Sequence, residues 1–199
     1  MSIYLARNGK MLTRVNGTRS FGEIISPIPP EPTVYEVTIG SQTWMSKNLA
    51  VDDGQDGIYT QTVNYGKGDV VEYYYTWYAA ERVAESIEGW HLPSDNEWYR
   101  LIDAVQGSAY AGTKLKSTIG WESKPGTDLY GFTALPAGYI TTSSGTSGGI
   151  GRGTCMWSAD MYDFDTAYYF FMNSVSTTVG HHTNNKGSSA YSVRLIKDS

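Results

Sequence analysis

Helical periodicity is confined to one stretch in the middle of this sequence, and that confinement constrains the fold more than any other feature. Apolar residues recur at helical spacing over residues 76–87, and Thr76 is a favourable N-cap. Ser94 and Glu97 then form a capping box ahead of a second apolar stripe, which Gly107 is expected to end. The pattern predicts two helices, one over 76–87 and one between Ser94 and Gly107.

The sequence on either side of the two helices favours strands. Residues 34–39 alternate apolar and polar side chains, and after a turn at 40–42 residues 43–45 return as the second strand of a hairpin. Beyond Gly107 the chain is rich in Gly, Thr, Ser and Tyr without helical periodicity, which indicates short strands and long loops. We predict an α+β fold with an antiparallel sheet and a loop-rich C-terminal half, because the order of elements does not alternate as βαβ.

The first 33 residues differ from the rest of the chain. Residues 27–32 contain four prolines, which favour a stiff, extended polyproline II spacer. Before them, residues 11–17 are typical of a short strand that ends in an Asn-Gly turn. We predict an N-terminal arm and Pro-rich linker over 1–33, used for attachment or oligomerisation, and a domain over 34–199. The alternative is that the arm packs on the domain and completes a sheet.

Charge, cysteine content and hydropathy argue against several classes of partner and site. The net charge is −5 without a run of Lys or Arg, so nucleic acid is not an expected partner. A single cysteine, Cys155, rules out an intrachain disulfide and a multi-cysteine zinc site. Apolar stretches fall short of the roughly 20 residues of a membrane helix. The first residues lack the apolar core of a secretory signal, so we expect neither membrane insertion nor export by that route.

Three other features suggest chemistry but do not meet its requirements. Asp52 opens an acidic turn, yet an EF-hand register would place Gly54 and Val63 at ligand positions, so we predict a polar turn. His181 and His182 are adjacent, and neighbours on a strand face opposite ways, which favours a recognition loop over a metal site. Cys155 has no recognisable base nearby and is interpreted as a packed thiol. We therefore expect no catalytic residue, metal or cofactor.

The segment 160–191 is the best candidate for a binding surface. Six aromatic residues fall within residues 162–171, more than a half-buried strand needs. If alternate side chains point inward, the others point outward, where rigid Tyr and Phe recognise partners at low entropic cost. The alternatives are burial of both faces, a contact between subunits, or, for the aspartates, a weak cation site. We predict that the ligand-binding residues are Asp160, Tyr162, Phe164, Tyr169, Phe171, Asn173, His181, His182, Asn184 and Tyr191.

A series of motifs runs through the chain from residue 34 to residue 198. It comprises residues 39–49, 89–98, 112–117 with Gly120 and Trp121, 131–139, 156–158, 167–169 and 192–197. In this order the motifs resemble the Fibrobacter succinogenes major paralogous domain. The resemblance implies a C-type-lectin-like fold of the formylglycine-generating-enzyme kind, found mostly in surface display modules. Relatives include the variable proteins of diversity-generating retroelements and of phages, in which the C-terminal segment carries the binding surface.

The same resemblance suggests which residues are structural. The tryptophans of the shared motifs are expected in the core, and Arg194 is expected to brace a loop through hydrogen bonds to carbonyls or a carboxylate. The copper site of formylglycine-generating enzymes needs a cysteine pair, which Cys155 alone cannot supply. The calcium-and-sugar triplets of true C-type lectins are also missing. The tryptophans in question are Trp44, Trp90, Trp98, Trp121 and Trp157.

We therefore expect a non-enzymatic phage virion protein, a fibre or decoration of head or tail, that displays a lectin-like domain for adhesion to a host surface glycan or protein. Residues 1–33 would attach it to other virion proteins, and a symmetric homo-oligomer such as a trimer would add avidity. Its location would be the virion, after assembly in the host cytoplasm. The alternatives are a bacterial cell-surface or secreted adhesin of the same fold, and a purely structural virion decoration protein.

Overall fold

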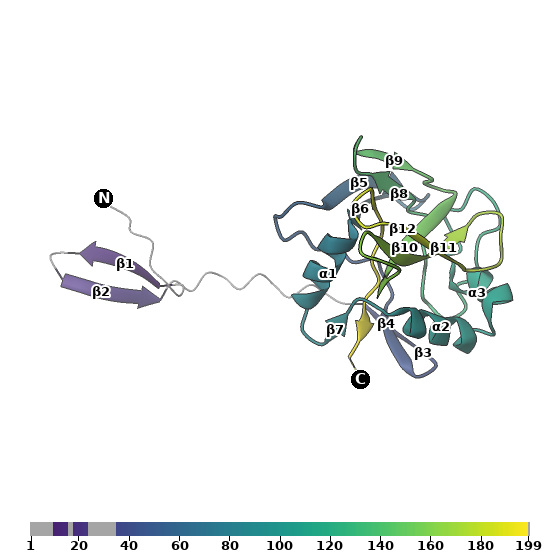
Figure 1. The fold of residues 1–199 in the computed structure, drawn as a ribbon, viewed down its shortest axis with the longest axis horizontal. Helices are drawn as coiled ribbons and strands as arrows, with labels where there is room; N and C mark the ends of the chain where they lie inside the picture. The colour runs from purple at the N-terminus through teal and green to yellow at the C-terminus, as the bar shows by residue number, and fades with distance from the viewer. Residues whose placement is uncertain (1–9, 16–17, 24–34, 199) are drawn as a thin grey trace. The chain divides into compact units, whose positions relative to one another are not determined.

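The computed structural model describes residues 10–15, 18–23 and 35–198. Two compact units make up the chain, Met1–Thr33 and Val34–Ser199 (Figure 1). The division falls at the boundary chosen from the sequence. That the first unit serves for attachment stays a prediction.

The first unit contains a short antiparallel hairpin. β1 (Lys10–Val15) pairs with β2 (Thr18–Glu23), with Val15 opposite Thr18. A strand is therefore present where the sequence predicted one. The predicted turn at Asn16 and Gly17 and the polyproline spacer at 27–32 lie outside the described residues.

The second unit is a mixed α+β structure whose strands form several small sheets. Within the described residues its sheets have the orders β3-β4-β14-β7, β10-β11-β12, β13-β8-β9 and β5-β6, with antiparallel neighbours throughout. The elements are β3 (Glu36–Ile39), β4 (Gln42–Met45), β5 (Ile58–Asn64), β6 (Asp69–Tyr75), α1 (Trp77–Glu85), β7 (Trp90–His91), α2 (Asp95–Ala104), α3 (Ser108–Leu115), β8 (Tyr139–Thr141), β9 (Thr146–Gly148), β10 (Gly153–Met161), β11 (Thr166–Asn173), β12 (Gly180–Asn185), β13 (Ser189–Ala190) and β14 (Ile196–Lys197).

Both predicted helices form, and both begin at the predicted caps. The Thr76 side chain accepts a hydrogen bond from the Ala79 amide at the start of α1. At the start of α2, Ser94 and Glu97 make both hydrogen bonds of the capping box. The apolar stripes behind the caps are buried, so local sequence rules and packing agree here.

The prediction of only two helices is wrong, because α3 follows directly after α2. α2 ends at Ala104, and the Gly107 amide closes its last turn by a hydrogen bond to the Ile102 carbonyl oxygen; Gly107, with φ of 84°, is also the N-cap of α3. The sequence of α3 has no clear apolar stripe, so periodicity did not reveal this helix. The helix packs closely against the backbone of Thr177 and Thr178, and only a glycine at position 112 allows that approach. A Cβ on Gly112 would lie 2.5 Å from the Thr178 carbonyl oxygen. Tertiary packing therefore fixes this helix.

The two ends of the second unit meet in one sheet. β14 lies between β4 and β7, with Ile196 opposite both Trp44 and His91. The predicted brace, Arg194, is fully buried and donates to the carbonyl oxygens of Met45, Phe132 and Thr133 and to the Asn48 side chain. Residues far apart in the sequence therefore close the scaffold.

Two core clusters lie on opposite sides of β11. Phe170 and Met172 belong to the cluster that contains Trp98, and Ala167 belongs to the one that contains Trp157. β11 therefore has packed neighbours on both faces. The five tryptophans predicted in the core are all buried: Trp44, Trp90, Trp98, Trp121 and Trp157. Among the described helices, none is both long and apolar enough to cross a membrane.

Candidate functional site

The last residue of β10, Met161, and the connection to β11, residues 162–165, present large apolar side chains to solvent. We call this segment, residues 161–165, the display tip. The Phe164 side chain is 87% exposed and that of Tyr162 is 63% exposed, and Met161 is exposed beside them. Such rings lose contact with water only when a partner covers them, which makes the tip the strongest candidate for a binding surface.

A buried lysine fixes the display tip from below. Lys186 is 2% exposed, and its Nζ donates to the carbonyl oxygens of Asp163 at 3.1 Å and Phe164 at 2.8 Å. The same Nζ contacts the Met161 sulfur and lies 4.8 Å from the centre of the Trp77 ring. The Lys186 ammonium therefore joins the tip to the start of α1.

The tip is also closed by its own hydrogen bonds. One Asp163 carboxylate oxygen accepts from the Asp165 amide and from both the amide and the hydroxyl of Thr166. These bonds hold the pKa of Asp163 below its ordinary value, with the Thr166 hydroxyl as the largest cause. The aromatic side chains thus project from a defined turn.

A second group of predicted residues gathers where β11 and β12 meet α2. The Tyr168 ring stacks on His181 with centroids 4.6 Å apart, and His181 Nε2 lies 2.9 Å from Asp95 Oδ2. His181 Nδ1 lies 3.0 Å from the Tyr99 hydroxyl. Asp160 accepts a hydrogen bond from the Asp95 amide at 2.7 Å, so Asp160 and His181 meet at the start of α2.

Tyr99 and Tyr168 complete this group, although sequence reasoning did not select them. Tyr168 is half-buried because His181 covers one side of its ring. Its edge faces the Tyr162 ring at 5.7 Å, which connects the group to the display tip. The outward-facing position of Tyr99 on its helix was the available signal.

The remaining predicted residues do not join the tip. Tyr191 is only 5% exposed and lies in the core cluster of Trp157, and Tyr169 packs against both rings. Tyr191 was therefore wrongly expected on an open surface, and Tyr169 is half-buried, because alternation along a strand does not reveal what covers its second face. Asn184 donates to the Tyr191 hydroxyl and is held within the same region.

Phe171, His182 and Asn173 lie elsewhere on the sheet. The half-buried Phe171 ring lies 5.3 Å from the exposed His182 ring on the neighbouring strand. Asn173 accepts hydrogen bonds from the amides of Val175 and Ser176, so its side chain closes a turn. Of the ten predicted residues, those brought together at or beside the tip are Asp160, Tyr162, Phe164 and His181.

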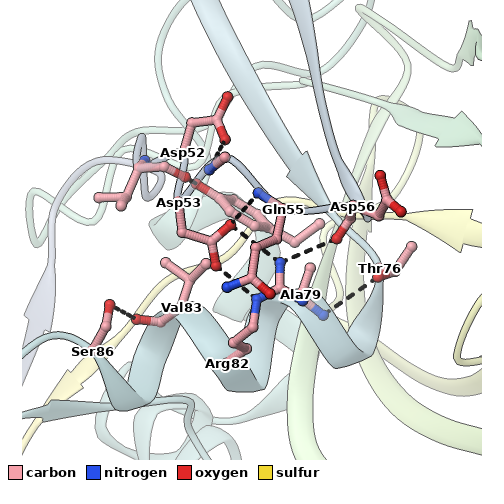
Figure 2. A network of polar contacts seen from close by, with 12 residues as sticks. Asp52, Asp53, Gln55, Asp56, Thr76, Ala79, Arg82, Val83 and Ser86 are labelled. Carbon is pink, nitrogen blue, oxygen red and sulfur yellow. Dashed lines mark hydrogen bonds and ion pairs between the residues drawn. The ribbon is translucent and has the colours of Figure 1, made fainter. Parts of the chain in front are cut away.

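The acidic turn at 52–56 is tied to α1, as Figure 2 shows. The Arg82 guanidinium donates to both Asp53 oxygens, at 2.6 and 3.2 Å, and to the Asp56 carbonyl oxygen. The amides of Gly54 and Gln55 bond to the carboxylates two residues before them. These contacts are those of the predicted polar turn.

Other reactive groups are held in structural environments. Burial raises the pKa of the Cys155 thiol to about 12, so the neutral thiol prevails at neutral pH. In the part of the chain that the structure describes, no three His, Cys, Asp or Glu side chains form a group that could hold a metal ion.

Comparison with known families gives one match. The sequence model described as the Fibrobacter succinogenes major domain matches residues 37–197. The match spans most of the second unit, from β3 to β14. Neither a curated protein nor a solved structure was matched.

Proposed function

The chain belongs to the Fibrobacter succinogenes major domain family, and from this premise we propose that it is a non-enzymatic binding and display protein of a phage particle. In this proposal residues 1–33 attach the protein to other virion proteins. The second unit presents the display tip to a molecule of the host surface, and copies of the chain form a homo-oligomer.

The observation that carries the proposal is the exposure of Phe164 and Tyr162 on a braced turn. Exposed rings on an unbraced loop would be weak evidence of a binding site. Here the Lys186 ammonium donates to the carbonyl oxygens of the turn, and the Asp163 carboxylate accepts from the Thr166 amide, so the turn is held in place. Rings held in a fixed orientation bind a partner with less loss of conformational entropy. The tip therefore suits recognition.

We also propose that the second unit has the C-type-lectin-like fold. β4, from the β3–β4 hairpin, pairs with the last strand, β14, through Trp44 and Ile196, and this pairing closes the scaffold at its ends. Helices α1 and α2, and the later strands β10, β11 and β12, are consistent with this fold. In such a fold the scaffold stays constant while the loops carry binding.

The proposal is tested by binding of the full-length protein to bacteria from the source community. Replacement of both Tyr162 and Phe164 by Ser is expected to lower the bound fraction at least about tenfold, since two contact rings are lost. The matched control replaces Tyr110 and Leu129 by Ser, because these side chains are 60% and 63% exposed outside the tip. This control is expected to bind normally.

The location is tested by immunogold electron microscopy with antibody against residues 34–199. Gold on phage particles is the expected result. Gold on bacterial envelopes with bare particles would instead assign the protein as a cell-surface adhesin. Particle labelling without binding of the full-length protein to bacteria would indicate a purely structural decoration protein.

A further inference from the structure

We propose that the display tip and the carboxylates around it bind a cationic protein segment, in which Lys or Arg side chains alternate with apolar ones. This inference rests on the proposed function, because it names the class of partner for the same surface. It is carried by the exposed apolar side chains of the tip and by the charge that surrounds them.

Exposed apolar side chains lie both on the tip and at the start of α1. Met161, Tyr162 and Phe164 are exposed on the tip, and Tyr78 is exposed at the start of α1. The Tyr78 ring lies 5.7 Å from the ring of Trp77, and Trp77 packs against the ammonium of Lys186. The buried contact between Trp77 and Lys186 thus links the two exposed parts.

Carboxylates surround these apolar side chains. Asp160 and Asp165 are exposed at the two ends of the tip, and Glu81 and Glu85 follow Tyr78 on α1. Burial raises the pKa of Glu81, and the neighbouring charges of Glu85 and Asp160 raise it further. Three carboxylates from two elements therefore share one neighbourhood, and they repel each other until a cation joins them.

The nearby cation, Lys186, neutralises this surface only in part, because burial, Glu85 and Asp160 raise the pKa of Glu81 while the charge of Lys186 lowers it. Lys186 is buried, and its ammonium hydrogens point to the carbonyl oxygens of the tip. Among the ion pairs formed within residues 35–198, none includes Asp160, Asp165 or Glu81. A positive partner can therefore pair with carboxylates that the protein itself leaves available.

This combination of groups selects among the ligands that a Tyr-rich surface could bind. Lys and Arg side chains interact with aromatic faces and with carboxylates, and apolar side chains cover Met161 and Phe164. Phosphate-bearing or acidic polysaccharides carry the same sign of charge as the surface and are repelled. The surface therefore fits a basic protein segment better than an anionic glycan.

The test measures binding of fluorescent peptides to the full-length protein by anisotropy. The probes are a short peptide of alternating Lys and Leu, one of alternating Lys and Ser, and one of alternating Glu and Leu. The Lys-Leu peptide is expected to bind best, and raising salt from about 50 mM to about 500 mM should weaken it at least about tenfold.

Variants separate the charges from the rings. Replacing Asp160 and Asp165 by Asn and Glu81 by Gln is expected to weaken the Lys-Leu peptide at least about tenfold. The carboxamide oxygen introduced by Asp160→Asn can still accept the hydrogen bond from the Asp95 amide, so the fold is retained. The control variant changes Glu36 and Glu122 to Gln and Asp69 to Asn, which removes the same charge outside the tip and should bind normally.

The outcomes also distinguish this inference from the proposed function. Equal binding of the Glu-Leu peptide, or unchanged Lys-Leu affinity in the charge variant, would overturn the cationic partner. If the charge variant still binds bacteria while the Tyr162 and Phe164 variant does not, the display function holds and the partner class is wrong. If neither variant affects binding to bacteria, the proposed function itself is wrong.

Discussion

Two buried lysines hold two very different regions of this protein. Lys116, at the end of α3, is 1% exposed and donates to the carbonyl oxygens of Lys124, Asn173 and Ser176 at 2.7 to 3.0 Å. Lys186 is 2% exposed and holds the display tip in the same manner. Each ammonium also lies 4.8 Å from the centre of a tryptophan ring.

The difference lies in what each lysine stabilises. The Lys116 ammonium joins the segments that contain Lys124, Asn173 and Ser176, and the Trp121 side chain is buried beside it. Burial, with Lys124 as a neighbouring like charge, lowers the pKa of Lys116. Around Lys186 the same kind of contact leaves Tyr162 and Phe164 in solvent. One lysine closes the scaffold, and the other supports the exposed display tip.

Substitution of Lys116 by Met is expected to have the largest effect on stability. The change leaves three partly buried carbonyl oxygens without their donor, which should lower the free energy of unfolding by about 3 kcal/mol. For a domain of this size that corresponds to a fall in melting temperature of roughly 6–12 °C. Calorimetry measures the loss. Unchanged stability would contradict the scaffold role of Lys116.

Substitution of Lys186 by Met is expected to cost less stability and more binding. The tip carbonyls can reach water, so the free energy of unfolding should fall by only about 1–2 kcal/mol. The unbraced tip must then order on binding, which should weaken attachment to bacteria at least about tenfold. Binding is measured at equal folded protein. A Lys186 variant with normal binding would show that the brace is irrelevant to recognition.

Replacing Tyr162 and Phe164 by Ser is expected to leave stability almost unchanged. Both side chains are exposed, so the free energy of unfolding should shift by no more than about 0.5 kcal/mol. Urea unfolding checks this value, and the Tyr110 and Leu129 variant is the control. A loss as large as that for Lys116 would mean that the tip belongs to the scaffold.

The smallest expected effect concerns the pH dependence of the scaffold. Burial lowers the pKa of His91, but hydrogen bonds to Glu97 and Asp198 outweigh burial and raise it above its ordinary value of 6.5. Protonated His91 therefore adds stability below about pH 6.5, and this contribution disappears as the pH rises through the raised pKa. Because the side chain is partly exposed, the contribution should be only about 0.3–0.5 kcal/mol.

The measurement compares urea midpoints of the unchanged protein and of His91→Gln between about pH 5.5 and about pH 8. The difference between them should be present at acidic pH and vanish at basic pH. His182→Gln is the control, because the contacts of the His182 ring are with the rings of Tyr169 and Phe171. A difference that grows toward basic pH would have the wrong sign and refute the assignment.

Local features of the fold were predictable, and the site was predictable only in part. The capped helices α1 and α2 and the hairpin of β3 and β4 depend on residues within a few positions of one another. Phe164 and Tyr162 could be selected because they lie in a segment with six aromatic residues in ten. Tyr191 did not reveal its burial, because the Trp157 ring that covers it comes from a distant strand. Tyr99 joined the site only when α2 and β12 came together.

The sequence by itself determined the start of α1 and α2 and the hairpin of β3 and β4. These follow from caps, alternation and hydrophobicity, which act over short distances. Only the tertiary structure decided that Gly112 lies in a helix and that Lys116 and Lys186 are buried. The physical reason is that the Lys116 acceptors on Asn173 and Ser176 lie 57 and 60 residues away. A charged side chain is buried only where the folded chain brings such acceptors together.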